Sequence, residues 1–411
     1  MPFDKRYCVI LLPEAPVQVT YSYQTRRSGG IVLPASRPSK PRTKSSTRVR
    51  GEPRETPRKE TRANRSTIWV LSDGTAGMRL QAIALGDALV AADAHNQTNL
   101  VDVILTLPWW ARRFPRLAAI LPLSWLRAGL RAGLRAGLRA GINAGRHPAS
   151  GQPDLSAGMP DIAITCGRRM AGISIAIRRL GKAGGADTRT IHIQDPRLPP
   201  DYFDVLVVPQ HDPARGPNIV TSLASLNRLD TAKIKQAAAR LTSKWTSLPT
   251  PLVAVMLGGT NRRYRISADM ADEMAARLAN FAAKTGASLA MITSRRTPVD
   301  LLDRLTSSLD KTRYAVLDQH DDNPYPGILG IADAVIVTSD SVNMISEATV
   351  TGLPVLIADW QRESGRIGAF HDAMMAAGHC APLADTLPKK GFLPLNEMPE
   401  IAKAVLMRLG R

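Results

Sequence analysis

The chain has 411 residues, of which 44% are hydrophobic, so it can bury the cores of two ordinary domains. Its net charge of +19 lies almost entirely in two segments: residues 1–65 carry +10 and residues 103–153 carry +8. About +1 is left for the other 295 residues, which argues against a nucleic-acid-binding body.

The three cysteines exclude a disulfide framework and a Cys-x-x-Cys metal pair, because they are far apart and odd in number. We expect a reducing, cytoplasmic compartment and no metal. The charge-free apolar run Leu117–Leu126, beside the second basic segment, is too short to span a bilayer. The apolar N-terminal run is too short and wrongly flanked for a secretory signal.

Residues 1–65 are predicted to be a disordered basic tail, because residues 21–65 are rich in Ser, Thr, Pro, Arg and Lys and hold few aliphatic side chains. A translation start placed too early is the alternative. A first domain is predicted over residues 66–246, with a basic Trp/Arg insert at 107–153. Short β-branched runs alternate there with helical stretches, which favours a mostly parallel sheet covered on both faces. Its predicted strands are Ile68–Leu71, Leu100–Ile104, Asp161–Thr165, Thr190–Ile193 and Asp204–Val208, and its helices Thr75–Ala92, Arg168–Leu180 and Asp230–Trp245.

A linker at 247–251 precedes a second domain, predicted over residues 250–390, in which the pattern restarts. Its predicted strands are Leu252–Leu257, Ser288–Thr293, Ala334–Thr338 and Pro354–Ala358, and its helices Ser267–Lys284, Pro298–Ser308 and Ser341–Thr351. A last helix, Glu397–Leu409, is expected within residues 395–411. The sequence therefore predicts an α/β protein with two Rossmann-like domains facing across a cleft, and ligands at the carboxyl ends of the strands.

Strand-end loops of the first domain carry glycines and arginines. Gly74 and Gly77 follow the first strand and open a helix whose N–H groups could bind an anion; a turn that needs glycine is the alternative. Arg168 and Arg169 follow another strand and could bind phosphate or an acceptor carboxylate, or else remain solvated.

Possible general bases also lie at strand ends of the first domain. Asp195 follows one strand, and His211 stands beside Asp212 after the next. A lone histidine is more often structural, but a histidine beside a carboxylate at a strand end favours proton transfer.

The second domain carries two anion-suited loops after neighbouring strands. Gly258 and Gly259 could cradle a diphosphate through backbone N–H groups. Arg295 and Arg296 follow the next strand, just before a proline that can start a helix.

The sharpest pattern runs from Thr338 to Val355. Asp340 or Ser341 should cap a helix, and Glu347 lies seven residues after Asp340 on the same face. A carboxylate on a helix between two buried strands is costly unless it is paired or faces a cleft, where sugar hydroxyls are suitable partners. A solvent-facing glutamate on an outer helix is the alternative.

Together these motifs resemble a known family. They are Ser-Asp-Gly-x-x-Gly-x-x-x-Gln at 72, Gly-Arg-Arg at 167, Gln-Asp-Pro-Arg at 194, Pro-x-His-Asp at 209, Gly-Gly-Thr-Asn at 258, Ser-Arg-Arg-Thr-Pro at 294, Asn-Pro-Tyr at 323 and Asp-Ser-Val-Asn-Met-Ile-Ser-Glu-Ala at 340. Over roughly residues 67–385 the chain is similar to the bacterial branch of the mitochondrial-fission "elongated mitochondria" family, which in turn looks like GT-B glycosyltransferases.

The resemblance implies a first domain for the acceptor, a second for a nucleoside-diphosphate sugar, and a last helix that crosses back. It implies Asp73, Asp195 or His211 as the catalytic base, and Gly74, Gly77, Gln81, Arg168 and Arg169 around the acceptor or a phosphate. The implied nucleotide-sugar site is Gly258, Gly259, Thr260, Asn261, Ser294, Arg295, Arg296, Asn323, Tyr325, Asp340, Ser341, Met344, Ser346 and Glu347. Glu347 would hold ribose or sugar hydroxyls, and Asn323 and Tyr325 would line the base pocket.

No metal and no cofactor are implied, because such enzymes usually stabilise the leaving diphosphate with arginines and helix N-termini. Two alternatives stay open. One is a nucleotide-sugar epimerase. The other is a non-catalytic adaptor, since plant members of the family are division factors that recruit a dynamin-related protein.

Residues 109–141 predict contact with an anionic membrane surface and a peripheral location on the inner face of the cytoplasmic membrane. Trp109, Trp110 and Trp125 are half of the six tryptophans, and seven arginines accompany them without one acidic residue. The Leu-Arg-Ala-Gly repeats from Leu126 should form a crude amphipathic helix that glycine weakens in water. A poorly ordered insert, with Trp109 and Trp110 packed in the core, is the alternative.

Overall fold

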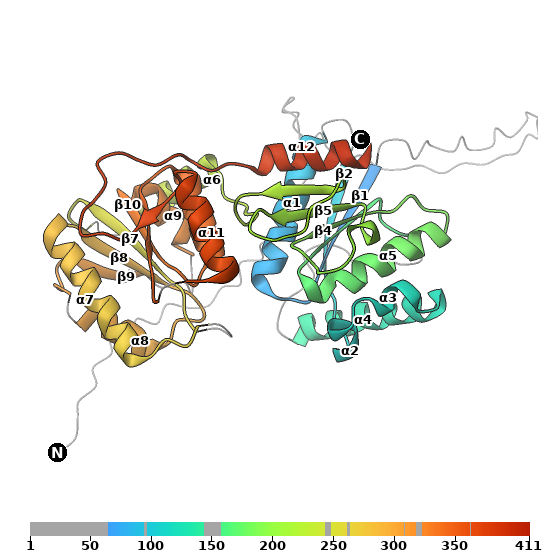
Figure 1. The fold of residues 1–411 in the computed structure, drawn as a ribbon, viewed down its shortest axis with the longest axis horizontal. Coiled ribbons are helices and arrows are strands. Elements are labelled where there is room, and N and C mark those ends of the chain that lie inside the picture. Colours follow the sequence, from blue (N-terminus) through green and yellow to red (C-terminus); the bar gives the residue numbers. More distant parts are fainter. Residues whose placement is uncertain are drawn as a thin grey trace, which may run out of the picture.

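The computed structural model describes residues 65–93, 97–143, 158–242, 248–260, 264–307, 309–317, 323–361 and 363–411. The predicted tail, apart from Arg65, and the predicted site residue Asn261 lie outside these ranges. The described chain forms two α/β domains side by side, each with helices packed on a parallel sheet (Figure 1).

The sheet of the first domain has six parallel strands. In spatial order they are β2 (Gln97–Ile104), β1 (Arg65–Ser72), β3 (Ile162–Cys166), β4 (Arg189–Ile193), β5 (Val205–Pro209) and β6 (Ile219–Ser222). Ile68 pairs with Leu100 on one side and with Ile162 on the other, so β1 is an interior strand. Both of its faces are buried, because Ile68 and Trp69 belong to different core clusters. Helix α1 (Ala76–Ala92) covers one face, and α5 (Ala171–Ala183), which follows the short helix η1 (Arg168–Met170), covers the other.

The sheet of the second domain also has six parallel strands. Their order is β9 (Tyr314–Leu317), β8 (Ser288–Thr293), β7 (Leu252–Leu257), β10 (Ala334–Thr338), β11 (Val355–Ala358) and β12 (Ala381–Pro382), the order of a Rossmann domain. Its helices are α7 (Ala268–Thr285), α8 (Val299–Ser307), α9 (Tyr325–Ile331), α10 (Val342–Ala348), η3 (Thr349–Thr351) and α11 (Gly365–Ala376). The predicted fold class, two Rossmann-like α/β domains, is confirmed.

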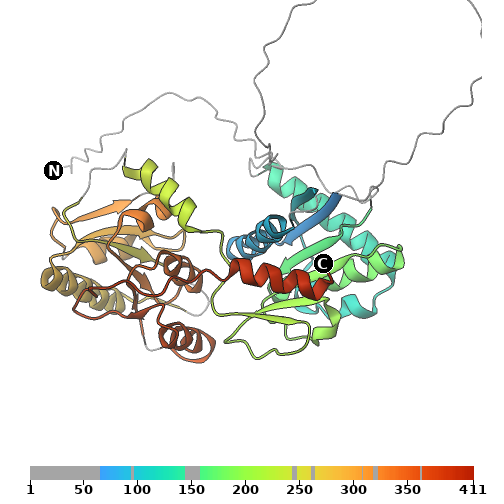
Figure 2. The ribbon, with the colours of Figure 1, turned by 90° about the horizontal axis from the view of Figure 1, so that it is seen from above.

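Two helices cross between the domains. Helix α6 (Thr231–Thr242), which the sequence places in the first domain, packs on α9 and contributes Ile234 to the core of the second. Helix α12 (Met398–Leu409) returns to the first domain and packs on α1 (Figures 1 and 2). Before α12, the Glu397 carboxylate accepts hydrogen bonds from the N–H groups of Leu223 and Ala224, at 2.8 and 3.0 Å.

The Leu-Arg-Ala-Gly repeats form helix α4 (Leu123–Asn143), which follows α2 (Trp109–Arg113) and α3 (Leu117–Ile120). Leu126 and Leu130 are buried in the core of the first domain, so one side of the predicted amphipathic helix packs against the protein. The alternative, with Trp109 and Trp110 in the core, is wrong, because both side chains are exposed. No helix in the described ranges is long and apolar enough to cross a membrane.

Repeat glycines have a packing role where α4 meets the end of β2. The carbonyl oxygen of Gly133 accepts a hydrogen bond from Thr106 N at 3.2 Å, and a Cβ at Gly137 would overlap the carbonyl oxygen of Ile104. At Gly129, in an equivalent repeat position, a Cβ would meet no other atom within 4 Å. Packing therefore requires glycine at Gly137 but not at Gly129, although both occupy the same position of the repeat.

We expect Gly129→Ala and Gly137→Ala to change stability in opposite directions. Alanine at Gly129 should stabilise the protein by about 1 kcal/mol, the difference in helix propensity. Alanine at Gly137 should destabilise it by about 1–3 kcal/mol, because helix and strand must separate to admit the methyl group. Urea denaturation of both variants measures this, and equal shifts would contradict the packing of α4 on β2.

Candidate functional site

The strand-end loops of the two domains meet at an interdomain junction. Gln81 of α1 donates a hydrogen bond to the Asn343 side chain of α10 at 3.3 Å. Arg366 of α11 forms an ion pair with Asp212, which follows β5, at 2.8 Å. The ring of His211 lies edge-on to Phe370 with centroids 5.5 Å apart. Gln81 and His211, two predicted site residues of the first domain, therefore lie against the second domain.

Strand order also points to this junction. In the first sheet the order reverses between β1 and β3, whose loops hold Asp73 and Arg169; in the second it reverses between β7 and β10, whose loops hold Gly258 and Asp340. Open α/β sheets bind ligands outside the carboxyl ends of strands at such switch points. The loops predicted from the sequence thus lie at the switch points of the two sheets.

Asp340 is buried, and its carboxylate is used within the protein. Its Oδ1 accepts hydrogen bonds from Thr338 Oγ1 at 2.8 Å and from Trp360 Nε1 at 3.1 Å. Its Oδ2 accepts one from Gly259 N at 3.0 Å and lies 3.5 Å from the Arg296 guanidinium. With four donors on two oxygens, Asp340 fixes the loops around it instead of offering a free acceptor.

The paired glycines pack against that carboxylate. Gly258 N donates to Thr338 Oγ1 at 2.8 Å, so both glycine N–H groups already have protein partners. A Cβ at Gly258 would overlap the Asp340 carboxylate, and one at Gly259 would overlap the Arg296 carbonyl. Close packing of three loops accounts for these glycines in this structure.

Several other predicted residues hold the same loops in place. Ser294 Oγ donates to the Gly258 carbonyl at 3.0 Å. Ser341 caps α10 by accepting from Met344 N at 3.4 Å. Ser346 Oγ accepts from Ser225 N at 3.0 Å and so joins α10 to the chain segment that leads to α6. Thr260 and Arg295, by contrast, are exposed.

Glu347 is a half-buried carboxylate on α10, next to Tyr325 at the start of α9. Burial raises the pKa of Glu347, and the neighbouring Tyr325 side chain opposes the rise. Burial and the Glu347 charge raise the pKa of Tyr325. Asn323 positions this tyrosine by accepting from Tyr325 N at 3.2 Å. Among the residues that the structure describes, Glu347 has no ion pair, so its carboxylate keeps acceptor capacity for a ligand.

In the first domain, Asp73 is paired with Arg169 at 3.3 Å. Burial raises the pKa of Asp73, but hydrogen bonds from Thr75 and the Arg169 charge outweigh burial, and the net pKa is lowered. Gly74 has a φ of +81°, which a residue with a side chain rarely adopts. Arg168 is exposed, and Gln81 is buried beside Gln194.

Arg366 pairs across the junction with Asp195 and with Asp212, the neighbour of His211. It lies 2.8 Å from Asp212 and 3.9 Å from Asp195, and Asp195 N donates to Asp212 at 3.3 Å. Burial lowers the pKa of His211; the Asp212 charge opposes this and the Arg366 charge adds to it. His211 Nδ1 is buried without a hydrogen-bond partner in the described part of the chain. Arg366 was not predicted from the sequence, because it belongs to no motif.

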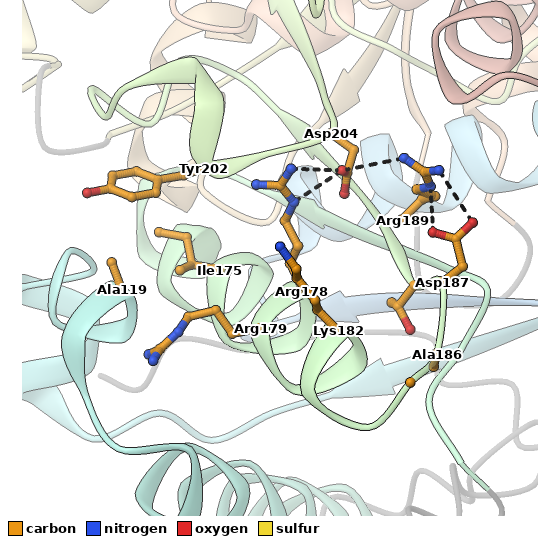
Figure 3. Close-up of a pocket in the computed structure, with 12 residues that line it drawn as sticks. Ala119, Ile175, Arg178, Arg179, Lys182, Ala186, Asp187, Arg189, Tyr202 and Asp204 are labelled. Carbon is orange, nitrogen blue, oxygen red and sulfur yellow. Dashed lines mark hydrogen bonds and ion pairs between the residues drawn. The ribbon is translucent and has the colours of Figure 1, made fainter.

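A cavity of about 640 Å³ lies elsewhere in the first domain, beside α5 (Figure 3). It is at the amino end of the sheet, because Arg189 begins β4 there. Its charges are largely paired with one another: Arg178 with Asp204 at 3.0 Å and Arg189 with Asp187 at 3.1 Å (Figure 3). We therefore place the candidate site at the interdomain junction and not in this cavity.

Fold and junction define a two-domain α/β protein whose strand-end loops form a polar site between the domains. The Mitochondrial fission ELM1 family matches residues 76–409, and the chain belongs to that family. The predicted family is confirmed.

The sequence identity between this chain and individual relatives is low. The "Mitochondrial fission protein ELM1" of Arabidopsis thaliana is 28% identical over 277 residues, covering 61% of this chain and 64% of that protein. The chain spans 64% of the length of the curated relatives it matches. Among solved structures, UDP-GlcNAc 2-epimerase from Methanocaldococcus jannaschii is 11% identical with a TM-score of 0.48, covering 83% of this chain and 99% of that one. UGT71G1 of Medicago truncatula, complexed with UDP-glucose, is 11% identical with a TM-score of 0.42, covering 84% and 90%.

Proposed function

We propose that the protein binds a nucleoside-diphosphate sugar at the interdomain junction and transfers the sugar to an acceptor, as GT-B glycosyltransferases do. The observation that carries the proposal is Glu347: a half-buried carboxylate with a raised pKa, beside a switch point and without a cation partner in the described residues. Such a group is costly for a protein to keep, and ribose or sugar hydroxyls would satisfy it. The family resemblance points to the same residue.

In this proposal the second domain holds the donor. Glu347 accepts hydrogen bonds from ribose or sugar hydroxyls, and Tyr325 lies beside the base. Arg295 is exposed next to the Gly258 loop and would contact the diphosphate, with Arg296 nearby. Because Asp340 and the two glycines already have protein partners, we assign them the role of shaping this surface.

His211 is the base that we propose among the three candidates of the first domain. Asp73 and Asp195 each face an arginine, so their carboxylates are already engaged in ion pairs, and the pKa of Asp73 is lowered. His211 has a lowered pKa, so it is neutral at pH 7, and its Nδ1 has no partner in the described chain. A neutral imidazole can take the proton of an acceptor hydroxyl as the sugar is transferred.

We also propose that the acceptor is carried by a membrane and that the protein works peripherally on the inner face of the cytoplasmic membrane. Support comes from the tryptophans and arginines of residues 109–141, a segment without an acidic side chain. Exposure of Trp109 and Trp125 in the structure is consistent with this.

A nucleotide panel tests the donor part of the proposal. At least one of UDP, GDP, ADP and CMP should raise the melting temperature of the full chain. Nucleotide sugars built on the nucleotide that binds should raise it too. A ligand at a hundredfold excess over its Kd stabilises by about 2.7 kcal/mol. Sugar transfer to an acceptor would support the transferase, and an isomerised donor would favour an epimerase instead. No shift with any nucleotide would favour a non-catalytic adaptor.

A further inference from the structure

Exposed apolar side chains gather on one surface of the first domain. In the described residues, six of the eleven exposed large apolar side chains lie within positions 109–125: Trp109, Trp110, Phe114, Ile120, Leu123 and Trp125. They belong to α2, α3 and the start of α4, three consecutive helices that lie together beside α5 (Figure 1). A concentration of exposed apolar side chains on neighbouring helices points to a contact with a partner or a membrane.

This surface is held in place from beneath. Leu126 and Leu130 anchor α4 in the core, and Ala118 anchors α3. The Arg179 guanidinium donates hydrogen bonds to the carbonyls of Ala118 and Leu121, both at 2.8 Å. Ile120 and Trp125 are thus exposed on helices whose opposite sides are buried.

The charged side chains carried by these three helices have one sign. The exposed arginines are Arg112, Arg113, Arg116, Arg127, Arg131 and Arg135. Residues 103–153 contain no acidic side chain. Tryptophan favours the headgroup layer, and each arginine near anionic lipid adds on the order of 1 kcal/mol. Aromatic, aliphatic and basic side chains in this combination fit an anionic bilayer.

We propose that α2, α3 and the start of α4 dock on an anionic bilayer, with Trp109, Ile120 and Trp125 entering the headgroup layer. The repeat leucines take no part, because those described are buried or partly buried. Helix α2 packs on η1, which carries Arg168 and Arg169, so docking brings the bilayer toward the first-domain side of the junction. This gives the proposed membrane-borne acceptor a route to the site, while the docking itself does not depend on any catalytic activity.

Liposome co-sedimentation of the full chain at physiological salt tests the surface. Wild type should bind vesicles of phosphatidylcholine with added phosphatidylglycerol and bind pure phosphatidylcholine more weakly. A variant with Trp109, Ile120 and Trp125 changed to Ser should bind at least about tenfold more weakly, since it loses most of the apolar area that would be buried. A variant with Arg112, Arg113 and Arg116 changed to Gln should lose the preference for phosphatidylglycerol.

A matched control uses three equally exposed apolar residues elsewhere. Val299, Leu393 and Met407 are 77%, 63% and 67% exposed, against 69%, 76% and 68% for Trp109, Ile120 and Trp125. Changing the control set to Ser should leave vesicle binding intact. Equal binding by the Trp109, Ile120 and Trp125 variant and by the control variant, or no binding by wild type, would overturn the proposal. The proposal would also be overturned if light scattering shows a dimer for wild type and a monomer only for the Trp109, Ile120 and Trp125 variant. A second copy of the chain would then cover the surface. Nucleotide binding serves as a separate readout, so failure of docking and failure of the proposed function are distinguishable.

Discussion

Glu347→Gln is expected to stabilise the free protein at neutral pH and to weaken nucleotide-sugar binding. Burial raises the folded-state pKa of Glu347 above its unfolded value. The contribution of Glu347 to the free energy of unfolding is therefore most favourable below the unfolded pKa. It is lost as pH rises from the unfolded pKa through the folded pKa. Glutamine does not ionise, so the variant's advantage in melting temperature should grow across that window and be small at lower pH.

The loss of affinity follows from the same carboxylate. Removing the charged acceptor from a hydrogen bond between a carboxylate and a ligand hydroxyl costs about 1.5–3 kcal/mol. This corresponds to an increase in Kd of about ten- to a hundredfold. Titration calorimetry with the nucleotide sugar found in the panel measures it. Glu273→Gln, at an exposed position of α7, is the control and should change neither quantity. If neither the affinity nor the pH dependence of stability changes, Glu347 is a surface residue without a role in ligand binding.

Strands were the most predictable part of the fold. Buried parallel strands are short aliphatic runs, and β7, β8 and β10 stand out in the sequence for that reason. Helix α9 was missed because Tyr325-Pro-Gly-Ile-Leu-Gly-Ile resembles a loop. Its glycines allow close contact with α6: a Cβ at Gly327 would lie 2.9 Å from the Ala237 carbonyl, and one at Gly330 would lie 2.7 Å from Ala238 Cβ. Tertiary packing outweighs helix propensity there.

The sequence predicted which loops make up the candidate site. It did not predict which of their side chains are free to bind a ligand. The sequence places Asp340 and Glu347 on one helix face, yet only the fold shows that Asp340 meets the Trp360 indole from the next strand-end loop. Likewise, a pattern cannot show that Arg366 reaches a carboxylate of the other domain, because that pair is brought together only when the domains meet.

Arg366→Gln is expected to weaken the contact between the domains. Asp212 is almost completely buried, and without the guanidinium its charge would lack its main partner. Breaking a fully buried pair costs about 3–5 kcal/mol. Because 39% of the Arg366 side chain is exposed to solvent, we expect a smaller loss, about 1–3 kcal/mol. The melting temperature should fall, and the effect of the substitution should shrink in high salt.

A double-mutant cycle with Asp212→Asn separates this pair from the rest of the junction. If the two side chains stabilise one another, the double variant should be more stable than the sum of the single effects predicts. Arg304→Gln with Asp272→Asn is the matched control, an exposed ion pair at 3.0 Å within the second domain, and its coupling should be small. Strictly additive effects at Arg366 and Asp212 would mean that the ion pair does not hold the domains. Coupling there would mean that the ion pair between Arg366 and Asp212 helps to hold the two domains together beside His211.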